Sequence, residues 1–244
     1  MKTVWIVYIV ILVYYLLGTV GIYFINRRKE PQIKRKAWIK HVNYFIITNL
    51  VFFSIAINPV IFRYVAALII IVGFYELFKL YRGSGFSHKG FFLASIIILA
   101  SLSIGFYCFS LMDKGLILFA FLIIAIFDGF SQVSGQLLGR TKLFPKISPN
   151  KTVEGLIGGS LVAVLSAFVF KNLFTASSLK AIIMTAVVVV FAFLGDTAKS
   201  LYKRQYNVKD FSNLIPGHGG FLDRFDSLIA GGAGVTLLGL IMNF

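Results

Sequence analysis

Long apolar runs separated by short polar segments dominate the chain from end to end. An α-helix needs about 20 mostly apolar residues to cross a bilayer. Eight runs approach or exceed that length, at residues 3–25, 42–57, 60–80, 91–110, 115–137, 153–174, 179–202 and 220–243. The second run is short and ends at Asn58-Pro59. The pattern predicts an all-α fold, a polytopic transmembrane helix bundle of about eight spans.

The composition points to the same class of protein. Hydrophobic residues make up 58% of the 244 residues and charged residues only 14%, which is more apolar surface than a soluble fold of this length can bury. Intrinsic disorder, a secreted disulfide scaffold and a soluble nucleic-acid binder are excluded. The first run is too long for a signal peptide and lacks a cleavage site after it, so we expect it to be retained as a helix.

The basic residues are distributed unevenly between the two sides of such a bundle. With eight spans, one side receives 19 of the 24 Lys and Arg residues. Cytoplasmic loops carry an excess of Lys and Arg. We therefore expect the link 26–41 and the loops 138–152 and 203–219 to face the cytoplasm. Both termini would face away from it, in a bacterial cytoplasmic membrane.

The acidic residues point to a functional region in the second half of the chain. Glu76 is explained by a snorkelling ion pair with Lys79. A carboxylate within an apolar helix usually marks a buried site, as at Asp128 and Asp196. We expect residues 1–110 to form N-terminal membrane helices and 111–244 a catalytic region of the same integral membrane unit. Six of the nine carboxylates lie at the cytoplasmic ends of the last four spans: Asp128, Glu154, Asp196, Asp210, Asp223 and Asp226. A purely structural role, in which these acids pair with nearby Lys and Arg, stays open.

The spacing of three acids predicts a metal site. Asp223 and Asp226 are three residues apart, so a helix starting near Gly220 would project both from one face. Together with Asp196 from a neighbouring helix, they would supply hard oxygen ligands suited to Mg²⁺. Nearby positive charge indicates a polyanionic ligand and comes from Lys203, Arg204 and Lys209.

Two loops carry residues suited to binding phosphate. Gly219 and Gly220 would let backbone amides approach a phosphate near a helix N-terminus, and His218 is either a site residue or a structural donor. The segment 148–152 precedes a span and offers hydroxyls and amides, although an ordinary basic loop is the alternative. Metal, cations and a Gly-rich turn indicate phosphoryl or nucleotidyl transfer, and the apolar bundle indicates a lipid substrate.

At these residues the chain resembles the CDP-diacylglycerol synthase (phosphatidate cytidylyltransferase) family. The segment 148–155 is similar to the family's S-P-x-K-T-x-x-G loop. The sequence departs from the family after Asp128, where Ser131-Gln132 stands in place of Ala-Tyr, which indicates a divergent branch. The family's C-terminal signature, S-x-x-K-R-x4-K-D-x5-P-x-H-G-G-x-x-D-R-x-D, is filled by Ser200, Lys203, Arg204, Lys209, Asp210, Pro216, His218, Gly219, Gly220, Asp223, Arg224 and Asp226.

The resemblance implies conversion of CTP and phosphatidate to CDP-diacylglycerol and pyrophosphate with Mg²⁺, at the surface of the lipid bilayer. It implies that Asp196, Asp223 and Asp226 hold the metal and that Lys203 and Arg204 act with them. A second, monovalent cation is left open. Gln132 lies one helical turn after Asp128, so we expect both to face one pocket. The implied substrate-binding residues are Asp128, Gln132, Arg140, Ser148, Lys151, Thr152, Ser200, Lys209, Asp210, His218, Gly219, Gly220 and Arg224.

Three other functions remain compatible with the residues. A CTP-dependent lipid kinase would transfer the γ-phosphate to a lipid alcohol and would yield CDP. A transporter would place polar residues along a whole path through the membrane, whereas these acids crowd one end. An inactive structural relative is the third alternative. A homodimer is compatible with the sequence, and no nucleic-acid partner is expected.

Overall fold

A computed structural model describes residues 2–212, 214–215 and 219–242. Within these ranges, eight helices are long and apolar enough to cross a membrane. The predicted all-α bundle is confirmed, and the chain is an integral, multi-pass membrane protein. In chain order the elements are α1 Lys2–Asn26, α2 Pro31–Ile57, α3 Pro59–Gly83, α4 Lys89–Ser110, α5 Lys114–Leu138, β1 Lys142–Phe144, β2 Ser148–Thr152, α6 Val153–Phe170, the short 3₁₀ helix η1 Lys171–Leu173, α7 Ser178–Gln205 and α8 Leu222–Met242.

Helix α2 begins earlier than the hydrophobic pattern predicts. It starts at Pro31 rather than near residue 42, so most of the basic link is helical. Proline suits the first helical position, and Lys and Arg are good helix formers, which explains a helix that continues beyond its apolar part. The helix break predicted at Asn58-Pro59 is present, since α2 ends at Ile57 and α3 begins at Pro59. The Asn58 side chain caps α3 by accepting a hydrogen bond from Val60 N at 3.0 Å.

The loop predicted over residues 138–152 contains a small antiparallel hairpin. Strand β1 pairs with β2 in the register Lys142 to Thr152 and Phe144 to Ser148. Thr152 ends the hairpin and caps α6, because its hydroxyl accepts a hydrogen bond from Gly155 N at 3.1 Å. The hairpin therefore holds Lys151 at a fixed place beside the helix bundle.

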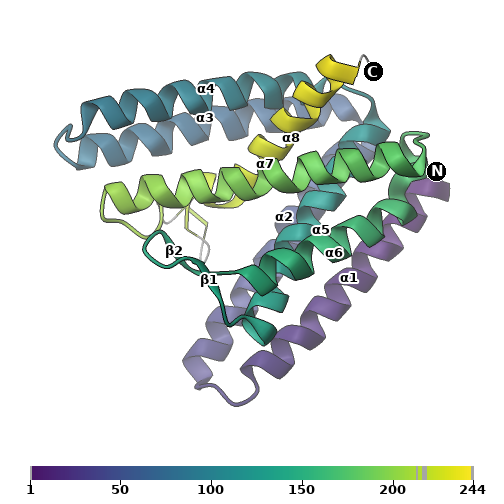
Figure 1. Ribbon diagram of the computed structural model, residues 1–244, viewed down its shortest axis with the longest axis horizontal. Helices are drawn as coiled ribbons and strands as arrows, with labels where there is room; N and C mark the ends of the chain where they lie inside the picture. Colours follow the sequence, from purple (N-terminus) through teal and green to yellow (C-terminus); the bar gives the residue numbers. More distant parts are fainter. Residues whose placement is uncertain (1, 213, 216–218, 243–244) are drawn as a thin grey trace.

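Helix α8 lies at the centre of the bundle. It packs against α3, α4, α5 and α7, and 72% of its most apolar stretch is buried, compared with 11% for α1. In Figure 1, α8 runs obliquely across the right-hand ends of α3 and α4 toward the C-terminus. A polar side chain at the start of α8 can therefore reach groups from several other helices.

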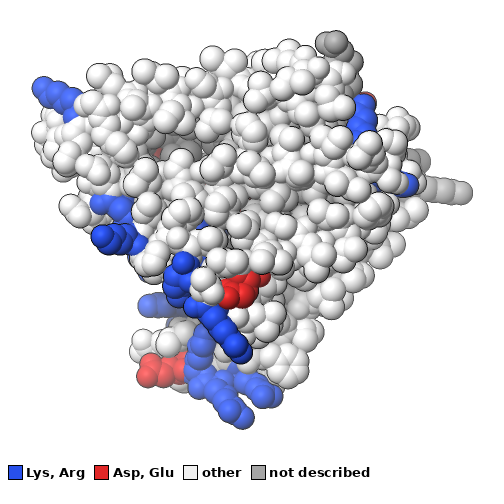
Figure 2. All heavy atoms as spheres, in the orientation of Figure 1, with Lys and Arg blue, Asp and Glu red and all other residues white. Residues whose placement is uncertain are grey.

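The two ends of the bundle differ in charge. Helix α1 begins and α8 ends on the side away from the β1–β2 hairpin (Figure 1). Figure 2 shows most of the visible Lys and Arg side chains gathered toward the hairpin end, with few on the opposite side. The structure thus has the charge asymmetry on which the topology prediction depends.

Candidate active site

The centre of the candidate site is a chain of ion pairs that links α7, α8 and β2. Lys199 Nζ lies 2.8 Å from Asp196 Oδ1 and 2.9 Å from Asp226 Oδ2, so one ammonium group joins two helices. Lys151 Nζ lies 2.9 Å from Asp196 Oδ2. The Asp196 side chain is 34% exposed, whereas the Asp226 side chain is only 8% exposed. The cluster is therefore enclosed and opens at one edge.

Helices α7 and α8 approach closely at this level because Gly195 has no side chain. A Cβ atom on Gly195 would lie 2.5 Å from the Cβ of Ala230 and 2.9 Å from the carbonyl oxygen of Asp226. Such contacts are too short for real atoms, so any larger residue would push the helices apart. The glycine thereby allows the neighbouring Asp196 to share Lys199 with Asp226.

Lys199 is a central residue that sequence reasoning missed. In the sequence it enters only the count of basic residues that sets topology. Its spacing of three from Asp196 places both residues on one helix face, and this was the available signal. Its link to Asp226 could not be foreseen, because that contact depends on how α7 packs against α8.

Lys151 is held in the cluster by three kinds of contact. Besides its ion pair with Asp196, its Nζ donates a hydrogen bond to Thr197 Oγ1 at 2.7 Å. The ammonium group also lies 4.5 Å from the centre of the Phe193 ring, a distance typical of a cation–π contact. The structure therefore brings Lys151 to the acidic cluster, as expected for a site residue.

Asp128 faces the same cluster from a third helix, α5. Its carboxyl group interacts with the Ser227 hydroxyl on α8 and with the charges of Asp196, Asp226 and Lys199. Three acids from three different helices therefore surround one lysine. Asp128 thus lies at the same end of the bundle as Asp196 and Asp226, as the sequence predicts.

The Asp223 carboxylate pairs with Lys203 rather than with Lys199, although the Asp223 backbone carbonyl oxygen accepts a hydrogen bond from Lys199 Nζ at 3.2 Å. The three-acid metal site stays a prediction. Asp223 Oδ1 lies 2.5 Å from Lys203 Nζ, and Asp223 Oδ2 accepts hydrogen bonds from the N–H groups of Phe211 at 2.9 Å and Gly220 at 3.0 Å. Its side chain is 2% exposed. Because Asp223 lies in the first turn of α8, it folds back to cap that turn. Asp223 and Lys203 thus form a buried structural pair.

The backbone amides that begin α8 are already hydrogen-bonded to carboxylates. Gly220 N donates to Asp223, as described above. Phe221 N donates to Glu76 Oε1 at 3.0 Å, and Leu222 N donates to Glu76 Oε2 at 2.7 Å. Three successive amides are therefore occupied by acids of the protein itself.

The amides of Gly219 and Gly220 are bonded within the protein in this structure, so their phosphate-binding role stays a prediction. The N–H and C=O groups of Gly219 pair with those of Ile215 at 3.2 and 2.9 Å. The φ angle of Gly219 is 83°, a left-handed conformation that favours glycine. Gly219 therefore shapes the turn before α8. The predicted site residue His218 lies outside the described residues.

Gln132 is exposed on α5, and its predicted place in one pocket with Asp128 stays a prediction. No hydrogen bond to its side chain is found within the described ranges. The neighbouring Ser131 points inward instead, since a Cβ on Gly159 of α6 would overlap the Ser131 hydroxyl. This contact shows how closely α5 packs on α6 at this level.

The remaining predicted residues surround the cluster rather than enter it. Arg204 Nε donates a hydrogen bond to the carbonyl oxygen of Ile147 at 3.1 Å and so fastens the end of α7 to the hairpin turn. Lys209 and Asp210 are exposed. The others are partly or fully buried near this end of the bundle: Ser148, Thr152, Ser200 and Arg224.

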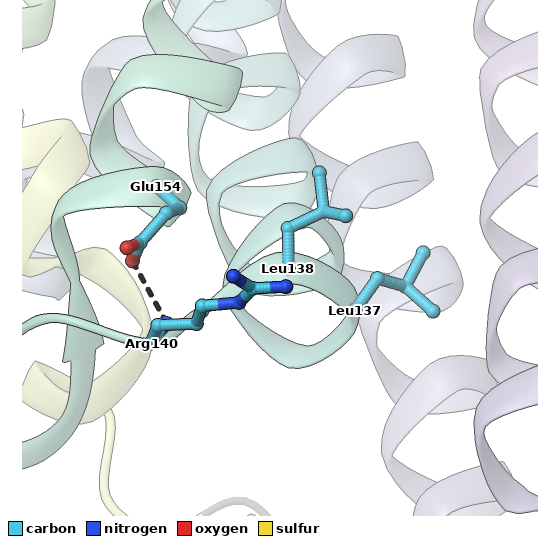
Figure 3. A pocket seen from close by; sticks show the side chains of 5 residues that line it. Leu137, Leu138, Arg140 and Glu154 are labelled. Atoms are coloured by element: carbon cyan, nitrogen blue, oxygen red, sulfur yellow. Dashed lines mark hydrogen bonds between the residues drawn. The ribbon is translucent and has the colours of Figure 1, made fainter.

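Arg140 lines an open pocket away from the ion-pair cluster. The pocket has a volume of about 420 Å³ and lies where α5 ends and α6 begins. Glu154 Oε2 accepts a hydrogen bond from Arg140 N at 3.1 Å, and Oε1 accepts one from Thr141 N at 3.1 Å. In Figure 3 the Arg140 side chain extends away from Glu154 toward Leu138. Glu154 thus fixes the backbone of this turn.

A second cavity, of about 140 Å³, borders the ion-pair cluster. Its walls are mainly apolar side chains of α3, α4, α7 and α8, and two charged residues, Lys199 and Asp226, also line it. A small apolar cavity beside charged groups is suited to an apolar part of a molecule that also carries a charged group.

Comparisons with known proteins identify the family of this chain. The model of the cytidylyltransferase family matches residues 5–242. Phosphatidate cytidylyltransferase of Staphylococcus saprophyticus is 43% identical over 150 residues, which cover 59% of this chain and 56% of the relative. The enzyme of the same name from Haemophilus influenzae is 43% identical over 122 residues, covering 47% of this chain and 42% of the relative.

The similarity to the Staphylococcus aureus phosphatidate cytidylyltransferase is of the same order, at 40% identity over 150 residues, or 59% of this chain and 56% of the relative. The chain thus spans about half the length of the curated relatives it matches. The family model, in contrast, extends over nearly all of the 244 residues. Because of that match, the chain belongs to the cytidylyltransferase family.

Proposed function

We propose that this protein is a membrane-embedded nucleotidyltransferase that converts CTP and phosphatidate to CDP-diacylglycerol and pyrophosphate. Family membership and the names of the relatives support the reaction type. The structural observation that carries the proposal is that Lys199 and Asp226 line an otherwise mainly apolar cavity. Such a cavity suits a short apolar part of a lipid that lies next to its anionic headgroup.

The reaction requires positioning more than acid–base chemistry. An oxygen of the lipid phosphate attacks the α-phosphorus of CTP, and the bond from that phosphorus to the bridging β-phosphate oxygen breaks, which releases pyrophosphate. A phosphate monoester is largely ionised at neutral pH, with a second pKa of about 6, so no strong base is needed. Lys199 and Lys151 supply positive charge beside the reacting phosphates, and enclosed charges of this kind stabilise a transition state.

The residues of the cluster fit a Mg²⁺ ion. Asp226 Oδ2 is buried, and its ion-pair partner among the described residues is Lys199 Nζ at 2.9 Å. Mg²⁺ is usually held by one or two carboxylates together with substrate phosphates and water. Asp196 and Asp226 would therefore hold the ion, which neutralises phosphate charge when bound. Asp223 pairs with Lys203 and with two backbone N–H groups, so its place as a third ligand stays a prediction.

Lys40 of α2 extends the positive charge around the site, and sequence reasoning did not identify it. The charge of Lys40 interacts with those of Arg224, Lys209 and Asp210. Arg224 Nε is buried and has no hydrogen-bond partner among the described residues. Lys40, Lys209 and Arg224 therefore form a basic rim suited to the triphosphate of CTP.

The Lys40→Ala variant should bind CTP more weakly. An exposed charge typically contributes up to about 1 kcal/mol to such an interaction, so the KM for CTP should rise roughly 3- to 5-fold, with kcat nearly unchanged. Steady-state kinetics would measure both constants. Arg35→Ala, on the same helix, is the matched control, because Arg35 is not among the charges that act on Lys40. A KM equal to that of the wild type would exclude Lys40 from the rim.

Lipid analysis tests the proposed reaction. Purified protein is incubated with CTP and Mg²⁺ in vesicles that contain either phosphatidate or diacylglycerol, and the lipids are identified by mass spectrometry. CDP-diacylglycerol is expected only with phosphatidate. Formation of phosphatidate from diacylglycerol would instead show a CTP-dependent lipid kinase.

The proposed membrane orientation places the ion-pair cluster on the cytoplasmic side. In a cysteine-free background obtained with Cys108→Ala, Lys146→Cys marks the hairpin turn and Ala176→Cys marks the opposite end of the bundle, between η1 and α7. A membrane-impermeant thiol reagent added to intact cells should label Ala176→Cys and leave Lys146→Cys unmodified until the cells are opened. Labelling of Lys146→Cys from outside would reverse the orientation.

A further inference from the structure

Glu76 of α3 is a fully buried carboxylate in the half of the chain without family motifs. Its exposed fraction is 0%. Its Oε1 accepts hydrogen bonds from Ser212 Oγ at 2.6 Å and Phe221 N at 3.0 Å, and its Oε2 accepts one from Leu222 N at 2.7 Å. Glu76 therefore binds the start of α8 and the segment that leads into it.

The ion pair predicted between Glu76 and Lys79 is absent. No Lys or Arg of the described residues lies within 4.0 Å of the Glu76 carboxylate. The negative charge is stabilised instead by two backbone N–H groups at a helix N-terminus, where the helix dipole favours an anion. Separating the Glu76 carboxylate from these N–H groups would leave a buried charge without hydrogen bonds, which is costly. The contact therefore holds the start of α8 against α3.

The surrounding packing is shaped for this contact. A Cβ on Gly220 would lie 2.4 to 2.7 Å from the two carboxylate oxygens of Glu76, so glycine is required there. The residue after Glu76 is also tied to the site region, because Tyr202 Oη donates a hydrogen bond to the carbonyl oxygen of Leu77 at 2.8 Å. Helix α3 thus contacts both helices that carry the ion-pair cluster.

We infer that Glu76 is a positioning residue that sets where Asp226 meets Lys199. Leu222, whose amide Glu76 holds, lies four residues before Asp226 and therefore about one helical turn away. A shift or rotation at the first turn of α8 moves the Asp226 carboxylate relative to α7. The inference deepens the proposed function and rests on it for its kinetic consequences.

The Glu76→Gln variant tests this role. Glutamine keeps the size of the side chain but places an NH₂ group against one of the N–H donors, so the start of α8 should loosen. A misplacement of about 1 Å can cost about 100-fold in rate. We expect kcat to fall roughly 10- to 100-fold, with the KM for CTP changed less than about twofold. Hydrogen–deuterium exchange of a peptide covering 219–226 should become faster.

Thr236→Val is the matched structural control. It removes the hydrogen bond from Thr236 Oγ1 to the Gly105 carbonyl oxygen, 2.8 Å long, on the same helix α8. Thr236 lies fourteen residues beyond Leu222, or about 21 Å along the helix axis. If both variants lower the melting temperature by the same amount, Thr236→Val should keep a much larger kcat than Glu76→Gln. Thr236→Val should also leave hydrogen–deuterium exchange of the 219–226 peptide unchanged.

Two results would overturn the inference. One is unchanged exchange of the 219–226 peptide in Glu76→Gln. The other is that Glu76→Gln and Thr236→Val lose the same fraction of kcat for the same loss of melting temperature. If Glu76→Gln does not fold, Ser212→Ala carries the same exchange test, because it removes one of the three donors and keeps the carboxylate. Hydrogen–deuterium exchange can be measured without turnover. A wild-type protein that makes no CDP-diacylglycerol would therefore refute the proposed function, whereas the exchange test of Glu76 would still apply.

Discussion

The Asp226→Asn variant is expected to lose about 10³-fold in kcat while its helix bundle stays folded. The substitution keeps the size of the side chain but removes the negative charge that faces Lys199 and would bind the metal, and the loss of one preorganised electrostatic contact costs about 10²- to 10³-fold. The fold is retained because Lys199 keeps Asp196 as its partner at 2.8 Å. Turnover of CTP and the melting temperature in detergent measure the two parts of this expectation.

Asp113→Asn is the matched control for Asp226→Asn. Asp113 caps α5 by accepting a hydrogen bond from Gly115 N at 2.8 Å, and asparagine is an equally good capping residue. It lies fifteen residues before Asp128 on that helix, about 22 Å along the axis. Wild-type turnover is expected for the control. An Asp226→Asn variant that keeps more than a tenth of wild-type kcat at limiting Mg²⁺ would refute the assignment of Asp226.

The Asp223→Asn variant should fail in a different way, through stability. Asp223 is the ion-pair partner of Lys203, which is only 8% exposed. Removing one member of a buried pair leaves the other charge uncompensated and costs about 3–5 kcal/mol of the free energy of unfolding. Unfolding in detergent followed by intrinsic fluorescence should therefore show a clear loss of melting temperature.

The contrast between the two variants distinguishes a structural acid from a metal ligand. Asp113→Asn again serves as the control with unchanged melting temperature. An Asp223→Asn protein that is as stable as the wild type but inactive would show that Asp223 acts directly on substrate or metal. That result would support the three-acid metal site, which the spacing of Asp223 from Asp226 suggests.

The fold could be predicted from the sequence because membrane spans are local features. Each span is a continuous apolar run, and the break at Asn58-Pro59 depends on adjacent residues. The extension of α2 to Pro31 was missed because its first turns are cationic rather than apolar. The hairpin at Lys142–Thr152 was missed because it is short and its strands carry no alternating apolar pattern.

The candidate site was predictable only in its location. Acids that interrupt apolar helices, such as Asp128 and Asp196, indicate a polar site whatever the packing. Which acid faces which lysine depends on contacts between distant segments. The hydrogen bond from Phe221 N to Glu76 joins residues 145 positions apart, and no spacing rule reveals it. The same holds for Asp223, whose helical spacing from Asp226 did not predict that it would turn to Lys203.

The fate of position-labelled CTP tests the proposed reaction most directly. Purified protein in vesicles that contain both phosphatidate and diacylglycerol is given Mg²⁺ and CTP labelled at either the α- or the γ-phosphate. The proposed attack at the α-phosphorus predicts that α-label enters the lipid fraction as CDP-diacylglycerol, that γ-label leaves as pyrophosphate, and that Asp226→Asn transfers neither. Label from the γ-phosphate in the lipid fraction, or no α-label there with the wild-type protein, would contradict it.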